Sequence, residues 1–438
     1  MQVSHLKRLV GVALATVLVA GCGVAGPSPS PTPNASGNIV ATGDVVMTSV
    51  SRVPAESDAA KAAASGINAL AADLYGQVAP KSDNVLFSPY SIAVALAMTR
   101  IGAKGETAVQ MDRVLHADRV GPFDPAFNGL DQALAKRAGT YTIENEKVPL
   151  ELATANRLYG QRNFAFSPTF LDRLSGYYGA GVGIVDYMKA TEAARKTINQ
   201  WVSDRTKTRI PELIKQGLLD TLTRFVLVNA IYMKARWLVP FDTKNTTASA
   251  FHRLDGSDTN AQLMHLGVES FAYGKGAGYQ AVRLPYVGGL SMVVILPDSG
   301  AFASFDTSLD AAKLAQITDG LASKPVKVSL PRFTFRDPTL LKPALSALGM
   351  PIAFSDSADF SGISPEEPLQ IAEVVHEAFI AVDEYGTEAA AATAVIGRAS
   401  AAPSQPIEFT VDRPFLFLIR DDETGAILFM GRVLDPTR

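Results

Sequence analysis

The sequence predicts an α+β fold in which helices come early and strands come late. Apolar residues recur at helical spacing between residues 67 and 101, whereas strand-like runs begin at residue 225 and continue to the C-terminus. Of the 438 residues, 47% are hydrophobic and 19% are charged, which is enough apolar material for a sizeable core. We therefore expect one large domain with extensive sheets.

Two helices are expected first. Between residues 67 and 78 the apolar side chains recur every three or four positions, as on one face of a helix. These side chains are Ile67, Leu70, Ala71, Leu74, Tyr75 and Val78. A second helix should start after Ser88, because Pro89 suits the first helical turn, where its missing N–H is not needed. Its body, residues 92–101, is apolar nearly all round, which indicates a buried helix.

Strands dominate the second half of the chain. Residues 225–233 are apolar on both faces, which indicates a central strand that is covered on both sides. Residues 326–330 alternate between apolar and polar, and residues 331–335 are expected to continue that strand.

The remaining elements are a helix and a hairpin. Residues 340–350 are expected to form a helix closed by Gly349. Residues 407–420 and 427–434 are expected to pair as a hairpin across the polar turn 421–425.

The N-terminus has the pattern of a secretion signal. Lys7 and Arg8 precede an apolar run, residues 9–20, that is too short to span a membrane comfortably. The run ends in Val-Ala-Gly-Cys at residues 19–22, which resembles the bacterial lipobox and predicts a lipid on Cys22. A plain signal peptide with an incidental cysteine is the alternative. The lipid would hold the chain on the extracytoplasmic side of a bacterial membrane.

A tether and one domain should follow this signal. Residues 27–33 alternate proline with serine or threonine, a composition typical of an extended linker. We therefore predict a signal peptide at 1–21, a lipid-anchored tether at 22–58 and a single domain at 59–438.

Composition excludes several classes of function. The formal net charge is −3 and there is no long basic run, so nucleic-acid binding is not expected. The five histidines are scattered and Cys22 is the single cysteine, so neither a metal site nor an internal disulfide is predicted. The chain lacks the Gly-x-Ser-x-Gly motif of many hydrolases, and the glycines at 274–278 lack phosphate-loop spacing. We expect a non-enzymatic protein without a cofactor.

The segment 384–393 is the most informative stretch of the chain. It follows a strand-like run, residues 379–382, and precedes a loop of small residues that reaches Pro403. Its glycine, threonines and alanines have nothing bulky that would keep them out of a β-sheet, yet they are weak strand formers by themselves. Such a segment suits a loop that can be exposed first and enter a sheet later. An alanine-rich flexible loop or the start of a helix is the alternative.

Several separated segments resemble, in order, the motifs of one family, the serpins or serine-protease inhibitors. They are residues 84–92, 228–237 with Phe241 and Thr246, 330–333, 348–350, 358–362, 375–378, 413–417 and 429–433. The resemblance implies about nine helices, three β-sheets and an exposed reactive loop near the C-terminus. It also implies a monomer that forms a covalent complex with a serine endopeptidase. The protease cleaves the loop, and the cleaved arm then inserts into the main sheet and carries the acyl-enzyme along.

The resemblance assigns three groups of residues. The hinge of the loop comprises Glu384, Gly386, Thr387, Glu388, Ala389, Ala390, Ala391 and Ala392. A polar group beneath the opening strands, the shutter, comprises Ser88, Ser91, Asn229 and His376. The breach, where insertion begins, comprises Trp237, Arg332 and Glu384. Small residues in the hinge imply an inhibitor; a non-inhibitory binding protein with the same fold is the alternative.

The cleaved bond is assigned by counting from the hinge. The family's usual spacing gives Ser400–Ala401, and the small residues around it suit elastase-like proteases. Counting back from Pro414 disagrees, because the loop is about three residues longer than is usual. Arg398–Ala399 is the alternative bond and would suit a trypsin-like protease.

Overall fold

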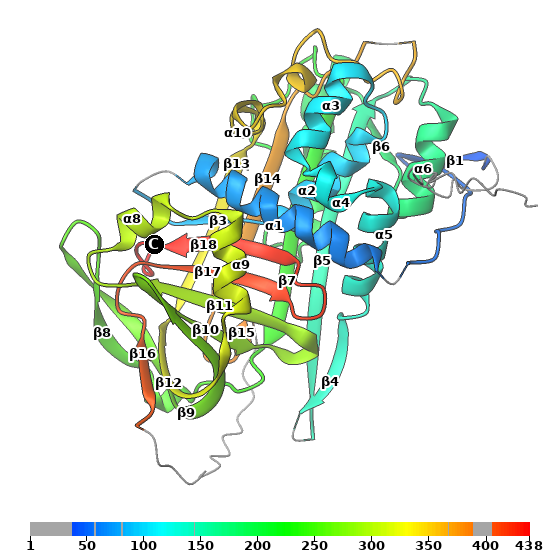
Figure 1. The fold of residues 1–438 in the computed structure, drawn as a ribbon. Helices are drawn as coiled ribbons and strands as arrows, with labels where there is room; N and C mark the ends of the chain where they lie inside the picture. Colours follow the sequence, from blue (N-terminus) through cyan, green and yellow to red (C-terminus); the bar gives the residue numbers. More distant parts are fainter. Residues whose placement is uncertain (1–36, 57, 80–81, 144, 367, 389–404) are drawn as a thin grey trace, which may run out of the picture. The chain divides into compact units, whose positions relative to one another are not determined.

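The computed structural model describes residues 37–438 apart from residues 57, 80–81, 144, 367 and 389–404. Its helices and strands are shown in Figure 1. The α-helices are α1 (Ala59–Val78), α2 (Pro89–Arg100), α3 (Gly105–Val114), α4 (Ala117–Val120), α5 (Phe123–Ala135), α6 (Pro168–Tyr178), α7 (Tyr187–Arg205), α8 (Phe302–Thr307), α9 (Ala311–Asp319) and α10 (Lys342–Ala347). The 3-10 helices are η1 (Thr243–Asn245), η2 (Val287–Gly289) and η3 (Pro351–Phe354).

The strands fall into two hydrogen-bonded networks. The first contains β1 (Ile39–Thr42), β2 (Val45–Thr48), β4 (Gly139–Ile143), β5 (Glu146–Gln161), β6 (Val182–Val185), β7 (Phe225–Arg236), β13 (Phe333–Leu340), β14 (Val374–Val382) and β15 (Gly386–Thr387). The second contains β3 (Val85–Phe87), β8 (Thr247–His252), β9 (Asp258–Gly276), β10 (Tyr279–Pro285), β11 (Leu290–Pro297), β12 (Ala322–Pro331), β16 (Ile407–Thr410), β17 (Phe415–Asp421) and β18 (Ile427–Val433).

The first network is the main sheet. Its strand order is β1-β2-β6-β5-β7-β15-β14-β13, and β4 is paired with β5. In the middle, β7 pairs antiparallel with β5 on one side and parallel with β14 on the other. The two-residue strand β15 lies between β7 and β14 at one end of the sheet. The combination of helices and mixed sheets confirms the α+β class. The hinge enters the main sheet between its two central strands, β7 and β14.

The second network accounts for a difference from the expected number of sheets. Three sheets were expected, but β9 and β12 pair continuously through a register shift between Lys327 and Val328, so their neighbours join one network. A bulge bends and twists a strand pair without ending it. The described residues also contain ten α-helices where about nine were expected. Three of these have six residues or fewer and are too short to show a helical period.

The main sheet is covered on both faces. On one side α2 contacts β5 and β7 of the main sheet and β18 of the second network, and its residues 89–99 are all buried. On the other side Ile198 and Val202 of α7 pack against Val226 and Val228 of β7. The apolar run at 225–233 therefore forms the doubly covered central strand that its pattern predicted.

The start of α2 also follows its sequence. Ser88 is the N-cap, and its hydroxyl oxygen accepts a hydrogen bond of 3.1 Å from the backbone N–H of Ser91. Pro89 occupies the first helical position, as predicted.

The predicted tether boundary at residue 58 is wrong, because residues 37–56 belong to the fold. β1 and β2 form a hairpin around Gly43, and β2 pairs with the edge strand β6. Beyond the hairpin, the Arg52 guanidinium pairs with Asp131 of α5 at 2.5 Å and the N–H of Val53 donates to the carbonyl of Gly176 at 2.7 Å. The β-branched residues on either side of the Thr-Gly-Asp turn are typical of a hairpin. The prediction missed them because it relied on the polar and small residues of the whole segment up to residue 58.

Three other predicted elements differ in their bounds. Residues 331–335 do not continue the preceding strand, because the chain passes at Arg332 from β12 of the second network to β13 of the main sheet. The helix expected at 340–350 is limited to the six residues of α10. The strand expected at 407–420 is interrupted before Pro414, so β16 pairs with β12 and only β17 pairs with β18.

Candidate functional site

The hinge leaves β14 through a tight turn that requires a glycine. The Asp383 carboxylate accepts hydrogen bonds from the backbone N–H groups of Tyr385 (2.8 Å) and Gly386 (3.1 Å). Gly386 has φ +153°, and a Cβ there would lie 2.1 Å from the carbonyl oxygen of Ala235 on β7. A side chain at this position would collide with the central strand, so the turn at residue 386 requires glycine.

β15 lies in register with the strands on both sides. Thr387 pairs with Ala235 of β7 and with Val382 of β14, and these two partners are 147 positions apart. Where β7 and β14 pair directly, Val374 pairs with Leu227, which is again 147 positions away. The two strands therefore separate around β15 without any change in their relative register.

An aromatic pair holds the hinge on the side of the main core. The hydroxyl groups of Tyr286 and Thr387 are hydrogen-bonded at 2.6 Å, and both residues are buried. Tyr286 stacks on Trp237 with ring centroids 4.2 Å apart and an interplanar angle of 11°. The Trp237 indole N–H donates to the carbonyl of Asp383 at 2.9 Å. Sequence analysis selected Trp237 but missed Tyr286, because no motif links it to a residue 101 positions away.

Arg332 and Glu384, both assigned to the breach, form an ion pair beside the turn. The Arg332 Nε donates to Glu384 Oε1 at 2.8 Å, and the Thr246 hydroxyl donates to the same oxygen. The Glu384 side chain is 2% exposed, while that of Arg332 is 43% exposed. Burial by itself would raise the pKa of Glu384, but the hydrogen bonds from Arg332 and Thr246 outweigh it, so the pKa lies below its ordinary value.

The shutter residues form one buried network. His376 of β14 pairs across the ladder with Asn229 of β7, and its Nδ1 is hydrogen-bonded to the Asn229 side-chain oxygen. The Nε2 of His376 accepts a hydrogen bond of 3.0 Å from the backbone N–H of Ser88. Asn156 of β5, which sequence analysis did not select, accepts from the Asn229 amide (3.1 Å) and from the Ser91 hydroxyl (2.6 Å).

These contacts fix the protonation state of His376. Burial lowers its pKa to about 3, so the imidazole is neutral at physiological pH. Because Nε2 accepts a hydrogen bond from the Ser88 N–H, the ring proton must be on Nδ1, which donates a hydrogen bond to the Asn229 side-chain oxygen. The direct His376–Asn229 bond joins β7 to β14, so opening the sheet here must break it.

Several predicted site residues lie outside the described residues. They are Cys22, Ala389, Ala390, Ala391, Ala392, Arg398, Ala399, Ser400 and Ala401.

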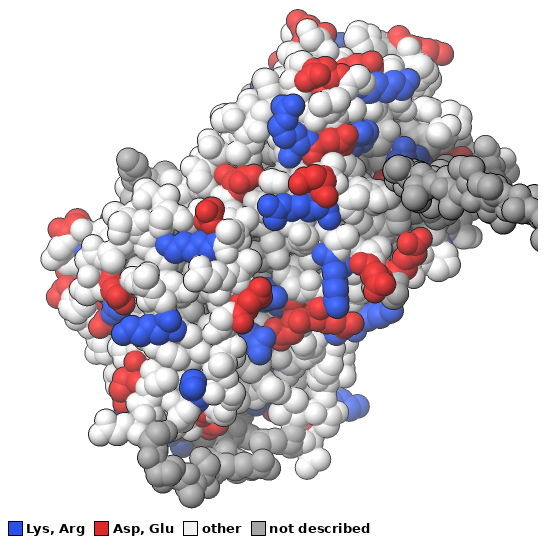
Figure 2. Space-filling model, viewed as in Figure 1, with Lys and Arg blue, Asp and Glu red and all other residues white. Residues whose placement is uncertain are grey.

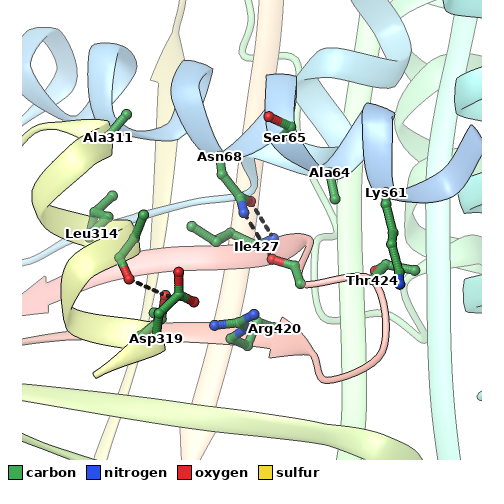
Figure 3. A pocket seen from close by; sticks show the side chains of 13 residues that line it. Lys61, Ala64, Ser65, Asn68, Ala311, Leu314, Asp319, Arg420, Thr424 and Ile427 are labelled. Atoms are coloured by element: carbon green, nitrogen blue, oxygen red, sulfur yellow. Dashed lines mark hydrogen bonds between the residues drawn. The ribbon is translucent and has the colours of Figure 1, made fainter. Parts of the chain in front are cut away.

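Among the pockets of the described residues, two that lie away from the hinge are of interest. One of about 260 Å³ is bounded by α1, α9 and the turn between β17 and β18, and Arg420 and Lys61 line it (Figure 3). The other, of about 700 Å³, is lined by Thr223, Arg224 and Ala372, which precede β7 and β14 at the end of the main sheet opposite the hinge. The candidate site is thus an opening in a sheet rather than a concave pocket.

The charged side chains give no sign of a polyanion site on the face drawn in Figure 2. Lysine and arginine are interspersed there with aspartate and glutamate. Within the described ranges, no group of three or more His, Cys, Asp or Glu side chains is placed to hold a metal ion. No helix in that same part of the chain is long and apolar enough to cross a membrane.

Comparison with known proteins shows the family. The profile of the serpin (serine protease inhibitor) family matches residues 65–436, which is most of the chain. The chain therefore belongs to the serpin family.

Relatives and solved structures agree with this assignment. The chain is 40% identical over 365 residues to leukocyte elastase inhibitor A of Mus musculus, covering 81% of this chain and 93% of the relative. The structure of Serpin48 of the insect Tenebrio molitor matches with a TM-score of 0.73 and 34% identity, over 84% of this chain and 97% of that one. Uncleaved ovalbumin matches with a TM-score of 0.76 and 29% identity, over 85% of this chain and all of the other.

Proposed function

We propose that this serpin inhibits serine endopeptidases by presenting the bond Ser400–Ala401 and then inserting the cleaved arm between β7 and β14. The observation that carries this proposal is the common register of the three ladders at Thr387. Because β15 is already in step with both neighbours, an arm that extends it needs no slip of β7 or β14.

The sequence of the arm fits that register. Continuing the pairing from Thr387 would set residues 389, 391, 393 and 395 on the face of the main core and the residues between them toward α7. The core-facing residues would be Ala389, Ala391, Thr393 and Val395. Thr393 would fall opposite Asn229 and His376, so the hydroxyl of the arm would meet these two polar side chains.

The length of the arm also fits. In the same register Gly397 would lie opposite Phe225, the first residue of β7. Cleavage after Ser400 would leave three residues between the end of the strand and the bond to the protease, whereas cleavage after Arg398 would leave one. From Thr387 to Ser400 the arm would span about 45 Å at ~3.4 Å per residue. The protease would therefore be carried along the whole of β7.

The chemical step would be ordinary acyl transfer. The serine oxygen of the protease would attack the carbonyl carbon of Ser400, and the peptide bond to Ala401 would break. The proton from the serine would pass to the leaving amine, and an ester would join Ser400 to the protease. Insertion has to outrun hydrolysis of this ester, so small side chains in the arm favour trapping over turnover.

The small residues around Ser400 favour elastase-like targets, which have shallow specificity pockets. The name of the mouse relative, leukocyte elastase inhibitor A, supports this choice. Arg398 keeps a trypsin-like target as the alternative.

The test is to mix the domain with elastase and, separately, with trypsin. We expect a complex that survives denaturing electrophoresis, release of a peptide that begins at Ala401, and a higher melting temperature of the cleaved protein. In an Ala391→Arg variant the charge would have to be buried against Ile231, so cleavage should proceed without a complex. Ala402→Arg, beyond the bond, is the matched control. Cleavage of the unmodified chain without a complex or added stability would leave a non-inhibitory binding protein.

We also propose that Cys22 carries the lipid of a bacterial lipoprotein. Because the backbone N–H of Gly37 already donates to Asp172 of α6, residues 22–36 would connect the lipid to the fold, a reach of about 50 Å when extended. Membrane fractionation of the expressed chain tests this: a Cys22→Ala variant should leave the membrane fraction, and retention there would refute lipidation.

A further inference from the structure

We propose that this serpin holds its hinge partly inserted and that Arg209 is the positioning residue that keeps it there. The inference rests on the proposed function, because it concerns the first step of the same insertion. Tyr286 anchors Thr387 on the core side of the sheet, whereas Arg209 anchors Glu388 on the side of α7. With both anchors in place, residues 386–387 already lie between β7 and β14, so insertion would continue from Glu388.

Arg209 is directed at the hinge by the segment that follows α7. Its Nε donates a hydrogen bond to Glu388 Oε1, and its guanidinium lies 5.7 Å from the ring centroid of Phe379 on β14. The two preceding residues, Lys207 and Thr208, both have left-handed backbone conformations, with φ of 52° and 64°. Consecutive left-handed residues other than glycine are unfavourable, so this turn has a defined shape that aims Arg209 at the sheet.

Glu388 marks the point where the chain stops following the sheet. Its backbone N–H donates to the carbonyl of Ala381 at 2.8 Å, which is the hydrogen bond that an inserted residue would make there. Its φ, however, is +51°, so the backbone turns out of the strand direction at this residue. Its side chain is 12% exposed, so the carboxylate depends on Arg209 for a charge partner. Rotation of Glu388 to an extended conformation is therefore the first movement of insertion.

The two anchors determine how fast the arm enters the sheet. With Arg209 removed, the Glu388 carboxylate loses its cationic partner, and Tyr286 on Thr387 remains as the side-chain anchor beside the backbone bonds of the hinge. The hinge would then leave the sheet more often. Insertion would in that case have to begin while β15 is not yet between β7 and β14. Because the arginine is half exposed, the contribution of the pair is at most about a fivefold change in rate. A slower insertion leaves more time for ester hydrolysis, so a larger fraction of the inhibitor should be cleaved without trapping protease.

The experiment compares Arg209→Gln, Glu388→Gln and the double exchange Arg209→Glu with Glu388→Arg. Lys196→Gln, which removes an exposed lysine of α7 outside that turn, is the control. In a Trp201→Phe background Trp237 is the only tryptophan, and its ring stacks on Tyr286 next to the hinge. Its emission in the uncleaved protein therefore reports whether the hinge is in the sheet, and the ratio of complex to cleaved inhibitor reports the rate of insertion.

We expect the two single variants to shift the Trp237 emission and to lower the ratio of complex to cleaved inhibitor by up to about fivefold. The control should match the unmodified chain, and the double exchange should restore both readouts. Unchanged emission and ratio in Arg209→Gln would overturn the inference. A change that the double exchange does not restore would overturn it too, because the arginine would then act through its packing on Phe379. If the unmodified chain forms no complex, the proposed function fails, while the emission of the uncleaved variants still decides the hinge contact.

Discussion

Replacing Thr393 with valine should destabilise the cleaved protein and leave the uncleaved protein unchanged. In the uncleaved structure the Nδ1–H of His376 donates to Asn229, so the shutter needs nothing from the loop. Insertion between β7 and β14 would separate these two residues, and the register places residue 393 between them. The threonine hydroxyl oxygen would then accept a hydrogen bond from the Nδ1–H of His376, which valine, of the same shape, cannot do.

The expected loss of stability follows from the hydrogen bonds of the shutter that remain after insertion. After insertion the Asn229 amide can still donate to Asn156, and Nε2 of His376 can still accept from Ser88. In the valine variant Asn229 Oδ1 has lost its donor, and the Nδ1–H of His376 is left as a buried donor without a partner. Such a group costs about 1–3 kcal/mol. We therefore expect the cleaved variant to lose about 1–3 kcal/mol and the uncleaved variant to lose less than ~0.5 kcal/mol.

The assay is guanidinium unfolding of both forms, with the cleaved form prepared by a protease that cuts beyond the arm. Thr393→Ser is the control, because it keeps the hydroxyl and removes a methyl group. An equal loss in both forms would mean that Thr393 acts before insertion. No loss in the cleaved form would mean that the arm inserts in another register, and the argument from the three ladders would fail.

Three further results are expected. Gly386→Ala should displace β15, because the new Cβ would collide with the Ala235 carbonyl. Hydrogen exchange of the backbone amides at residues 386–388 should therefore become faster. An unchanged exchange rate would contradict the requirement for glycine at this position. Arg332→Ala should cost about 1–2 kcal/mol at pH 7, because the buried Glu384 keeps only one side-chain donor. In urea titrations this loss should shrink as the pH falls below 4.5 and through the lowered pKa of Glu384, because the carboxylate then becomes protonated. Burial raises the pKa of Glu377 on β14 from 4.5 to about 7, so this group stabilises the fold only at low pH and loses that contribution as the pH rises through this window. Glu377→Gln should therefore gain about 1–3 kcal/mol at pH 8 and nothing at pH 4, and an equal effect at both would contradict the burial of its charge.

Local patterns in the sequence were sufficient for the elements that are buried. The apolar run of β7 and the Ser88–Pro89 start of α2 gave correct elements, because burial and capping act on neighbouring residues. Elements that depend on a partner were misjudged. Residues 39–48 pair with each other and, through β2, with the edge strand β6, a partner distant in sequence, whereas composition alone suggested a linker.

The candidate site divides in the same way. Motif resemblance selected Trp237, Arg332, Glu384 and His376, but it could not tell which contacts they make. Asn156, Tyr286 and Arg209 were missed, because each comes from a strand, strand end or loop far from the hinge in sequence and is brought near it only by folding.

The sequence alone determined the fold class, the presence of a hinge with small side chains and the residues on which the family resemblance depends. Each of these depends on local composition or on short motifs. Only the tertiary structure decided that the hinge is already two residues into the sheet and that β7 and β14 open in register around it. Register is a relation between strands more than a hundred residues apart, and it is set by the hydrogen bonds and the packing they share.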